Sequence, residues 1–159
     1  MELVSLTAEH DIAGFDCGKA SLNDFLVNDA LSDAAQGRSQ TYVLIDNAGQ
    51  IVGYHSIATG SIKAKRIPLS SPYSELGIVL LARLAVKTAE KGKGYGKYLF
   101  FDSLRKAVEV ADIAGAIGVR IDALDEEAKD FYVKYGFQSL TDRPLVLFRS
   151  MAEIKPLVH

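Results

Sequence analysis

Lys91 to Lys97 places three glycines among three lysines, between an apolar run and a helical pattern. Glycine permits positive φ and lets another molecule approach the backbone closely. Where a strand gives way to a helix, the unpaired N–H groups of the first helical turn favour an anion. The stretch therefore indicates a site for phosphate or another anion, and a solvated turn with an incidental run of charge is the alternative reading of the same residues.

Two well-known phosphate-binding loops do not fit this stretch. The P-loop requires Gly-x-x-x-x-Gly-Lys-Ser/Thr, and Gly92 has no glycine at the required offset followed by Lys-Ser/Thr. The dinucleotide fingerprint Gly-x-Gly-x-x-Gly is matched by Gly92 and Gly94 but has Lys97 in place of the third glycine. What remains is a basic-x-x-Gly-x-Gly pattern, Lys91 to Gly96.

The elements that must position this loop follow from the hydrophobic pattern. Ile78 to Val86 is a nearly continuous apolar run, typical of a central strand covered on both faces. A long helix is predicted over 95–114, with Gly115 as its stop. Later elements are a strand over 116–124, a helix over 126–135 capped by Asp125 and ended by Gly136, and a strand over 143–151.

The N-terminal half predicts a helix and a hairpin. Residues 21–31 are amphipathic and begin with Ser21 and Asp24, an approximate capping box. Residues 41–46 and 51–60 are rich in β-formers and flank Asn47-Ala48-Gly49, and residues 67–74 form a proline-containing loop. The order of elements predicts an α/β domain with a partly parallel sheet.

Length and composition limit the class of protein. A chain of 159 residues with 48% hydrophobic and 24% charged residues fits one globular domain. The absence of an apolar run near the roughly 18 residues of a membrane span, and of a secretory pattern at the N-terminus, predicts no membrane partner. The single cysteine, Cys17, suits the cytoplasm and is read as a small buried thiol. The histidines and Cys17 have no metal-ligand spacing, so no metal is expected, and His55 is read as structural.

Charge is weakly acidic overall but locally basic. The net charge of −2 does not indicate a nucleic-acid-binding protein. However, Arg83 to Lys97 holds five basic residues against Glu90 alone, and Lys63 to Arg66 forms a second basic cluster. Such a local patch can bind phosphate although the whole protein is acidic.

Several segments resemble the GNAT family of acetyl-CoA-dependent N-acetyltransferases. Lys91 to Gly96 is similar to the family's Gln/Arg-x-x-Gly-x-Gly/Ala segment, with Lys91 as a departure, and "DEEAKDFYVKYGF" (125–137) is similar to its later segment. "FDCGKASLNDFL" (15–26) and the segments "GRSQTYVLID" and "GQIVGYHSIATGSI" resemble a narrower branch, the toxins encoded beside ribbon–helix–helix antitoxins. The resemblance spans nearly the whole chain.

The resemblance implies a fold and a donor. The fold would be one GNAT domain over 1–159, with a mixed central β-sheet that has a splayed parallel strand pair and is flanked by helices. Acetyl-CoA would be the donor and coenzyme A the product. Its pyrophosphate would lie on the cradle formed by Lys91, Gly92, Lys93, Gly94, Tyr95, Gly96 and Lys97, and its pantetheine arm would pair with the backbone of Leu84, Ala85 and Val86.

The resemblance also implies a catalytic residue. Tyr132 aligns with the family's general acid, which donates a proton to the leaving thiolate. No base is evident, and Glu75 acting through water is a minor candidate. An α-amino group, with a pKa of about 7.7–8.0, loses its proton at neutral pH more readily than a lysine amine with a pKa of about 10.4, so an α-amine acceptor is favoured.

Arg83 would contact tRNA phosphate or pair with Asp122.

The leading interpretation is therefore a toxin that acetylates the α-amino group of aminoacyl-tRNA. Lys63, Lys65 and Arg66, with Arg83, are the candidate substrate-binding residues. A GNAT that modifies a small-molecule amine or a protein N-terminus is the alternative, which the net negative charge favours. A catalytically silent acetyl-CoA-binding or antitoxin-binding module is a third, which Tyr132 and the glycine loop argue against. The candidate partners are aminoacyl-tRNA, a ribbon–helix–helix antitoxin and a second copy of this chain.

Overall fold

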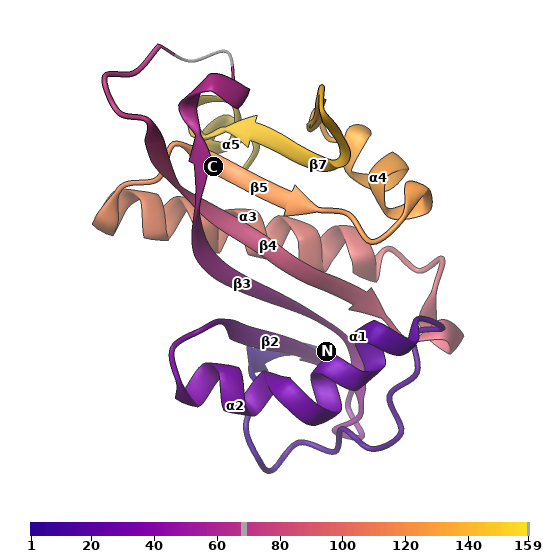
Figure 1. Cartoon of the computed structure of the whole chain (residues 1–159). Helices are drawn as coiled ribbons and strands as arrows, with labels where there is room; N and C mark the ends of the chain where they lie inside the picture. The colour runs from indigo at the N-terminus through magenta and orange to yellow at the C-terminus, as the bar shows by residue number, and fades with distance from the viewer. Residues whose placement is uncertain (68–69, 159) are drawn as a thin grey trace. The chain divides into compact units, whose positions relative to one another are not determined.

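The computed structural model describes residues 1–67 and 70–158 as a mixed α/β protein (Figure 1). The strands are β1 (Glu2–Ser5), β2 (Gln40–Ile45), β3 (Ile51–Lys63), β4 (Glu75–Val86), β5 (Gly118–Asp122), β6 (Gln138–Leu140) and β7 (Arg143–Ser150). The helices are α1 (Ala20–Asp24), α2 (Ala30–Ala35), α3 (Tyr95–Ala114), α4 (Glu126–Val133) and α5 (Met151–Val158). A π-helical segment, Phe25–Asp29, joins α1 to α2, and 3-10 turns cover Ala64–Arg66 and Thr88–Glu90.

The described strands form one mixed sheet in the order β1-β2-β3-β4-β5-β7-β6. β4 and β5 pair in parallel, from Val79–Leu81 to Val119–Ile121, and β4 runs on to Val86. β1 with β2, β2 with β3, β5 with β7, and β6 with β7 pair antiparallel. The predicted α/β class with a partly parallel sheet flanked by helices is confirmed.

The chain divides into two compact units. The first unit comprises Met1–Ala58 and Ala82–Ser103, and the second comprises Thr59–Leu81 and Leu104–His159. β3, β4 and α3 each contribute residues to both units. Each unit has its own apolar cluster and is described by itself below.

Aromatic packing around Tyr54 holds the core of the first unit. The Phe25 ring stacks on Tyr54 at 6.3 Å between centroids, and Phe15 meets it edge-on at 5.7 Å. The Tyr54 hydroxyl donates to the Leu22 carbonyl at 2.7 Å, and burial raises the pKa of this phenol well above its usual range. This packing fixes the N-terminal helical segment, which runs along β2 in Figure 1.

The start of α1 corrects one prediction. The predicted capping box at Ser21 and Asp24 is wrong, because the helix begins at Ala20 with Lys19 at its N-cap and no side-chain cap. The Lys19 carbonyl accepts hydrogen bonds from the amides of Leu22 and Asn23, so the first turn is already closed before Ser21 could act as a cap.

Several of the other predicted boundaries hold, whereas β3 ends three residues later than predicted and α4 ends two residues earlier. The hairpin turns at Gly49, whose φ is +81°, and α3 spans the predicted 95–114 with Gly115 at φ +84° after it. The Asp125 carboxylate caps α4 by accepting from the amide of Ala128 at 2.9 Å. The predicted loop over 67–74 includes Pro68 and Leu69, which lie outside the described residues, and its remaining residues form no helix or strand.

The second unit has an aliphatic core. Ile62, Ile78, Leu140 and Phe148 are buried together from β3, β4, β6 and β7. Within the described residues, no helix is long and apolar enough to span a bilayer. Across the same part of the chain, no group of three or more His, Cys, Asp or Glu side chains could hold a metal ion.

Candidate active site

The glycine loop connects the end of β4 to the start of α3 in the first unit. Gly92 and Gly94 have φ values of +82° and +86°, which side chains rarely adopt. A Cβ atom added to either glycine would have no heavy atom within 4 Å, so the space beside the backbone is open. The first amides of the 20-residue helix α3 follow directly. The loop can therefore bring backbone N–H groups and the positive end of a helix dipole to an anion.

Two lysines of the loop have partners within the protein. The Lys91 ammonium donates to the Cys17 carbonyl at 2.9 Å. The Lys93 ammonium pairs with the Glu90 carboxylate at 2.7 Å, and this hydrogen bond raises the pKa of Lys93. The backbone amides of the loop are therefore better placed than these two amines to receive a phosphate.

A hydrogen-bond network fixes the segment that receives Lys91. The Asp16 carboxylate accepts from the Gly18 amide at 2.8 Å and from the Asn23 side-chain amide at 3.0 Å. The Gly18 hydrogen bond is the main reason that the pKa of Asp16 is lowered, with Asn23 next. The Asn23 side-chain oxygen in turn accepts from the Cys17 amide at 2.9 Å. The Cys17 carbonyl is thus held in a defined place for Lys91.

The same segment also contacts the chain just before the loop. The Thr88 amide donates to the Asp16 carbonyl at 2.9 Å. Gly18 has φ +85°, and a Cβ added there would lie 3.5 Å from the Thr88 hydroxyl and 3.9 Å from the Lys91 ammonium. The "FDCGK" motif therefore supports the glycine loop, a role that its sequence did not reveal because the partners are far apart in the chain.

The end of β4 is covered on both faces, as predicted. Leu84 and Val86 pack with Leu44, Val52 and Leu99, whereas Ala85 lies in the cluster around Tyr54. The side chains therefore serve the core, and any ligand contact at these three positions would come from backbone groups.

Gly53 is a residue of this region that sequence reasoning missed. A Cβ atom at Gly53 would lie 2.7 Å from the Ala85 carbonyl oxygen and 2.7 Å from a Leu99 methyl group. Gly53 therefore allows the backbone of β3 to approach Ala85 closely. A glycine inside a run of β-formers is the signal that could have indicated this.

Cys17 was predicted to be a small buried thiol and His55 to be a structural histidine, and both side chains are buried. The buried His55 ring lies 2.7 Å from the Asp102 carboxylate, measured from Nε2. Cys17 is buried, and its thiol donates weakly to the Lys19 carbonyl at 3.6 Å.

Arg83 packs its guanidinium over an aromatic ring of the first unit. Its central carbon lies 3.9 Å from the centroid of Phe25, a cation–π contact. In the second unit, Asp122 is held in a bidentate pair by Arg120, at 2.8 and 3.1 Å. The predicted partners of Arg83, tRNA phosphate or Asp122, stay predictions.

Tyr132 lies in α4 of the second unit and is 6% exposed. Its ring meets Phe131 edge-on at 5.3 Å. Burial raises the pKa of its phenol well above the usual range, because the phenolate would lose its hydration. Tyr132 is therefore protonated at neutral pH.

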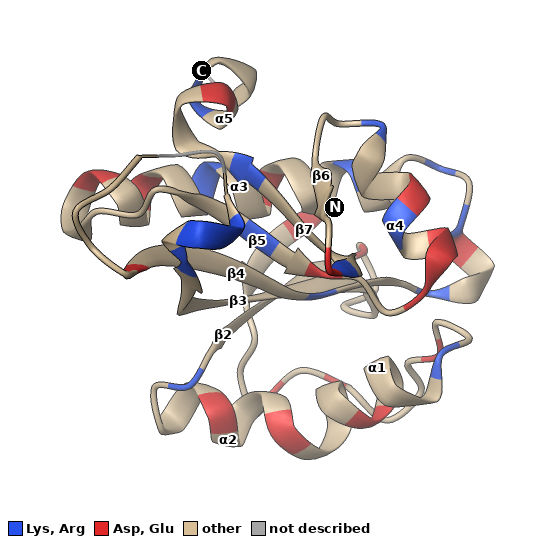
Figure 2. Ribbon diagram, turned by 45° about the horizontal axis from the view of Figure 1, so that its top comes forward, with Lys and Arg blue, Asp and Glu red and all other residues tan. Residues whose placement is uncertain are grey.

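The predicted basic cluster follows β3 in the second unit. Lys63 and Arg66 line a cavity with Glu75, Arg120 and Arg143, whereas Lys65 is not part of its lining. Glu75 directly follows the predicted loop and is the first residue of β4, because β4 begins three residues before the predicted apolar run. Figure 2 marks basic residues in blue on β5 and acidic residues in red on α4 of this unit.

Two comparisons place the chain among known proteins. Residues 37–139 match the model of the acetyltransferase (GNAT) domain. The chain is 33% identical over 152 residues to a protein of Mycobacterium tuberculosis named tRNA-acetylating toxin, covering 93% of this chain and 90% of that protein.

Solved structures of one toxin have the same fold. AtaT complexed with acetyl-methionyl-tRNAfMet superposes with a TM-score of 0.91 at 26% identity, over 99% of both chains. A tyrosine-to-phenylalanine mutant of AtaT, bound to the C-terminus of the antitoxin AtaR and to acetyl-CoA, superposes with a TM-score of 0.85 at 25% identity, over 98% of this chain and 96% of that one.

Proposed function

This chain belongs to the GNAT family of acetyltransferases, and from that premise we propose that it transfers the acetyl group of acetyl-CoA to the α-amino group of aminoacyl-tRNA, as the toxin of a toxin–antitoxin pair. The observation that carries the proposal is the similarity to a tRNA-acetylating toxin over 93% of the chain. AtaT, a structural relative, was solved with an acetylated aminoacyl-tRNA. The open glycine loop and the buried phenol of Tyr132 fit the proposed chemistry.

The glycine loop binds the pyrophosphate of acetyl-CoA in this proposal. Its two glycines of positive φ leave open space beside the backbone, and the first amides of α3 add a partial positive charge. Lys97, at the first turn of α3, supplies a cation. The backbone of Leu84, Ala85 and Val86 holds the pantetheine arm.

Tyr132 is the proposed proton donor. Bound acetyl-CoA supplies an activated thioester, whose C–S bond breaks as the acceptor amine forms the new C–N bond. The Tyr132 phenol gives its proton to the departing sulfur, and the amine releases a proton to water. The Tyr132 phenolate then takes a proton back from water, so that the enzyme returns to its starting state. The raised pKa of Tyr132 keeps the donor protonated, and an α-amine of pKa about 7.7–8.0 is already partly neutral at pH 7 without a strong base.

Basic residues of both units are proposed to contact tRNA. Arg83 belongs to the first unit, whereas Lys63, Lys65 and Arg66 belong to the second. The net charge of −2 is unusual for a protein that binds RNA and favours a small-molecule amine or a protein N-terminus as the alternative acceptor. Local clusters supply the positive potential that the whole chain lacks.

Partners and location follow from the same proposal. An antitoxin of the ribbon–helix–helix type neutralises the enzyme, in keeping with the antitoxin bound to AtaT. A second copy of the chain completes the assembly, and the site of action is the cytoplasm, where tRNA is charged. The two units act as one acetyltransferase domain, since the family match runs through both of them.

Controlled expression in a bacterium tests the proposed toxin. Induction of the wild-type chain without an antitoxin is expected to stop growth and amino-acid incorporation into protein. Tyr132→Phe is expected to relieve the arrest, whereas Tyr135→Phe, which removes a phenol from the turn after α4, is expected to arrest growth like the wild type. Arrest by Tyr132→Phe at equal protein level would contradict the proposed catalytic role.

A further inference from the structure

A charged cavity of about 230 Å³ lies within the second unit. Its charged lining consists of Lys63, Arg66, Glu75, Arg120 and Arg143. These residues come from the end of β3, the 3-10 turn after it, and the strands β4, β5 and β7. The topology thus gathers four cations and one carboxylate from distant parts of the sequence at one hollow.

Two of the arginines are held in place by carboxylates outside the lining. Arg120 forms a bidentate pair with Asp122 and lies 3.5 Å from the Ser61 carbonyl. Arg66 pairs with Asp142 at 3.0 Å. A guanidinium has five N–H donors, so each arginine keeps donors for a ligand while its orientation is fixed. Guanidinium groups held in a fixed orientation are well placed to donate hydrogen bonds to phosphate oxygens.

Lys63 and Arg143 add further positive charge. Both side chains are exposed at the cavity, on β3 and at the first residue of β7. Asp122 and Asp142 balance the two anchored arginines and Glu75 balances one further cation, so that the cavity region keeps a net excess of positive charge. An anionic ligand is therefore favoured over a cationic or neutral one.

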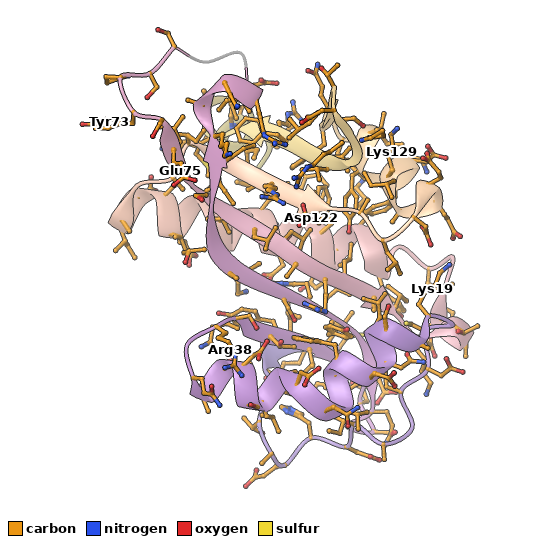
Figure 3. All side chains as sticks on the ribbon, in the orientation of Figure 1. Lys19, Arg38, Tyr73, Glu75, Asp122 and Lys129 are labelled. Atoms are coloured by element: carbon orange, nitrogen blue, oxygen red, sulfur yellow. The ribbon has the colours of Figure 1, made fainter. Side chains whose placement is uncertain are left out.

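Glu75 narrows the class of ligand. Figure 3 shows Glu75 at the start of β4 and Asp122 at the end of β5. A carboxylate in a cationic cavity repels a free phosphate dianion, but it accepts a hydrogen bond from a donor that lies beside a singly charged phosphodiester. The ribose 2′-hydroxyl of RNA is such a donor, and it is the group by which proteins distinguish RNA from DNA.

We propose that this cavity binds one nucleotide of single-stranded RNA, with the phosphodiester on the arginines and Lys63 and the ribose 2′-hydroxyl donating to Glu75. The inference rests on the proposed function, because it locates a contact for the RNA part of the acceptor. It adds Glu75, Arg120 and Arg143 to the residues that recognise the substrate.

Binding of short oligonucleotides tests the proposal. The probes are a labelled single-stranded RNA that ends in cytidine-cytidine-adenosine, as tRNA does, and the DNA of matching sequence. Fluorescence anisotropy is measured at several salt concentrations with the full chain and no acetyl-CoA. The wild type is expected to bind the RNA more tightly than the DNA.

Two variants separate the phosphate contact from the ribose contact. Arg143→Gln is expected to weaken both probes and to reduce the salt slope by about 0.7, the value for one phosphate contact on a single strand. Glu75→Met, which keeps the side-chain length but cannot accept a hydrogen bond, is expected to weaken RNA about three- to tenfold. The same variant is expected to leave DNA binding unchanged or stronger, because a repulsive charge is gone.

A control and three outcomes make the test decisive. Lys155→Gln removes a cation of the second unit that lies outside the cavity and pairs with Asp112, so its effect is expected to be small. Tighter binding of both probes by Glu75→Met, equal losses in Arg143→Gln and Lys155→Gln, or no preference of the wild type for RNA would each overturn the inference. The results also distinguish this inference from the proposed function. If the chain acetylates charged tRNA while the cavity variants bind RNA like the wild type, only the cavity inference is contradicted. Loss of acetyl transfer with the expected binding pattern would contradict only the proposed function.

Discussion

The Nζ atom of Lys91 donates a hydrogen bond to the carbonyl oxygen of Cys17 at 2.9 Å, between residues 74 positions apart in the chain. The bond joins the first residue of the glycine loop to a segment that Asp16 and Asn23 hold in place. Lys91 therefore anchors the glycine loop through its side chain, which leaves the proposed contacts with acetyl-CoA to the backbone amides of the loop.

Lys91→Met removes this anchor while it keeps the aliphatic length of the side chain. We expect acetyl-CoA affinity to fall about three- to tenfold, the range for one hydrogen bond, with an unchanged KM for the acceptor. Titration calorimetry measures the first quantity and steady-state kinetics the second. Lys93→Met is the matched control, because its exposed pair with Glu90 contributes little. An equal loss of affinity in both variants would mean that the lysines act as charges and not as an anchor.

Gly94→Glu is expected to weaken acetyl-CoA binding severely. The substitution places a carboxylate and a side chain in the open space beside the loop and strains a backbone with φ +86°. Gly49→Glu is the control: its φ of +81° and open surroundings match, but it lies in the β2–β3 turn. Calorimetry is expected to show wild-type affinity for Gly49→Glu alone. Unchanged affinity in a folded Gly94→Glu variant would remove the loop from the cofactor site.

Tyr132→Phe is expected to lower kcat by at least about 10²-fold, because acid–base groups typically contribute 10²–10⁴. The ring and its contact with Phe131 stay, so acetyl-CoA affinity and thermal stability are expected to be nearly unchanged. Tyr135→Phe is expected to keep wild-type turnover. A decrease of less than about twofold for Tyr132→Phe would exclude the general-acid role.

Burial of Tyr132 also predicts the pH dependence of the enzyme. The raised pKa means that the folded chain holds this proton more tightly than the unfolded chain does. The corresponding stability is fully present below the ordinary tyrosine pKa of about 10 and is lost as pH rises through the raised value. We therefore expect that ionisation of Tyr132 causes no decline of kcat between about pH 7 and 9. A decline of kcat in this range that occurs in the wild type and is absent from Tyr132→Phe would contradict the raised pKa of Tyr132.

Gly53→Ala is expected to destabilise the first unit. The added methyl group would lie 2.7 Å from the Ala85 carbonyl oxygen, a backbone atom that cannot move aside cheaply. A loss of about 1–3 kcal/mol in the free energy of unfolding is expected, as for other overpacked sites. Gly77→Ala in β4 is the control, since a Cβ there meets no heavy atom within 4 Å. Denaturant titration measures both, and equal stabilities would show that β3 and β4 adjust without strain.

Local signals predicted the elements around the site. The apolar run before the glycines, the helical spacing after them and Gly115 predicted β4 and α3, because each signal lies within a few residues of the element that it defines. Asp125 predicted the start of α4 for the same reason. β1, β6 and α5 were not predicted: the two strands are four and three residues long, and α5 contains Pro156.

Contacts between residues far apart in the chain could not be predicted from the sequence. Nothing near Lys91 indicates that its partner is Cys17, and nothing near Glu75 indicates that Arg120 and Arg143 share its cavity. The identity of Ser21 suggested a cap, but whether a serine caps a helix depends on where the first turn closes, and here Lys19 closes it. Tyr132 could be singled out through the family resemblance, whereas its burial and the resulting pKa required the structure.

The central claim is tested most directly by following labelled acetyl groups from acetyl-CoA. The wild-type chain is incubated with total charged tRNA, with uncharged tRNA and with free amino acids, and label in each acceptor is measured. We predict label on charged tRNA alone, in a bond that survives on the amino acid after the ester to tRNA is hydrolysed, and less of it as salt rises because phosphate contacts release counterions. Label in free small amines alone, or equally in charged and uncharged tRNA, would contradict the proposal and leave an acetyltransferase with a different acceptor.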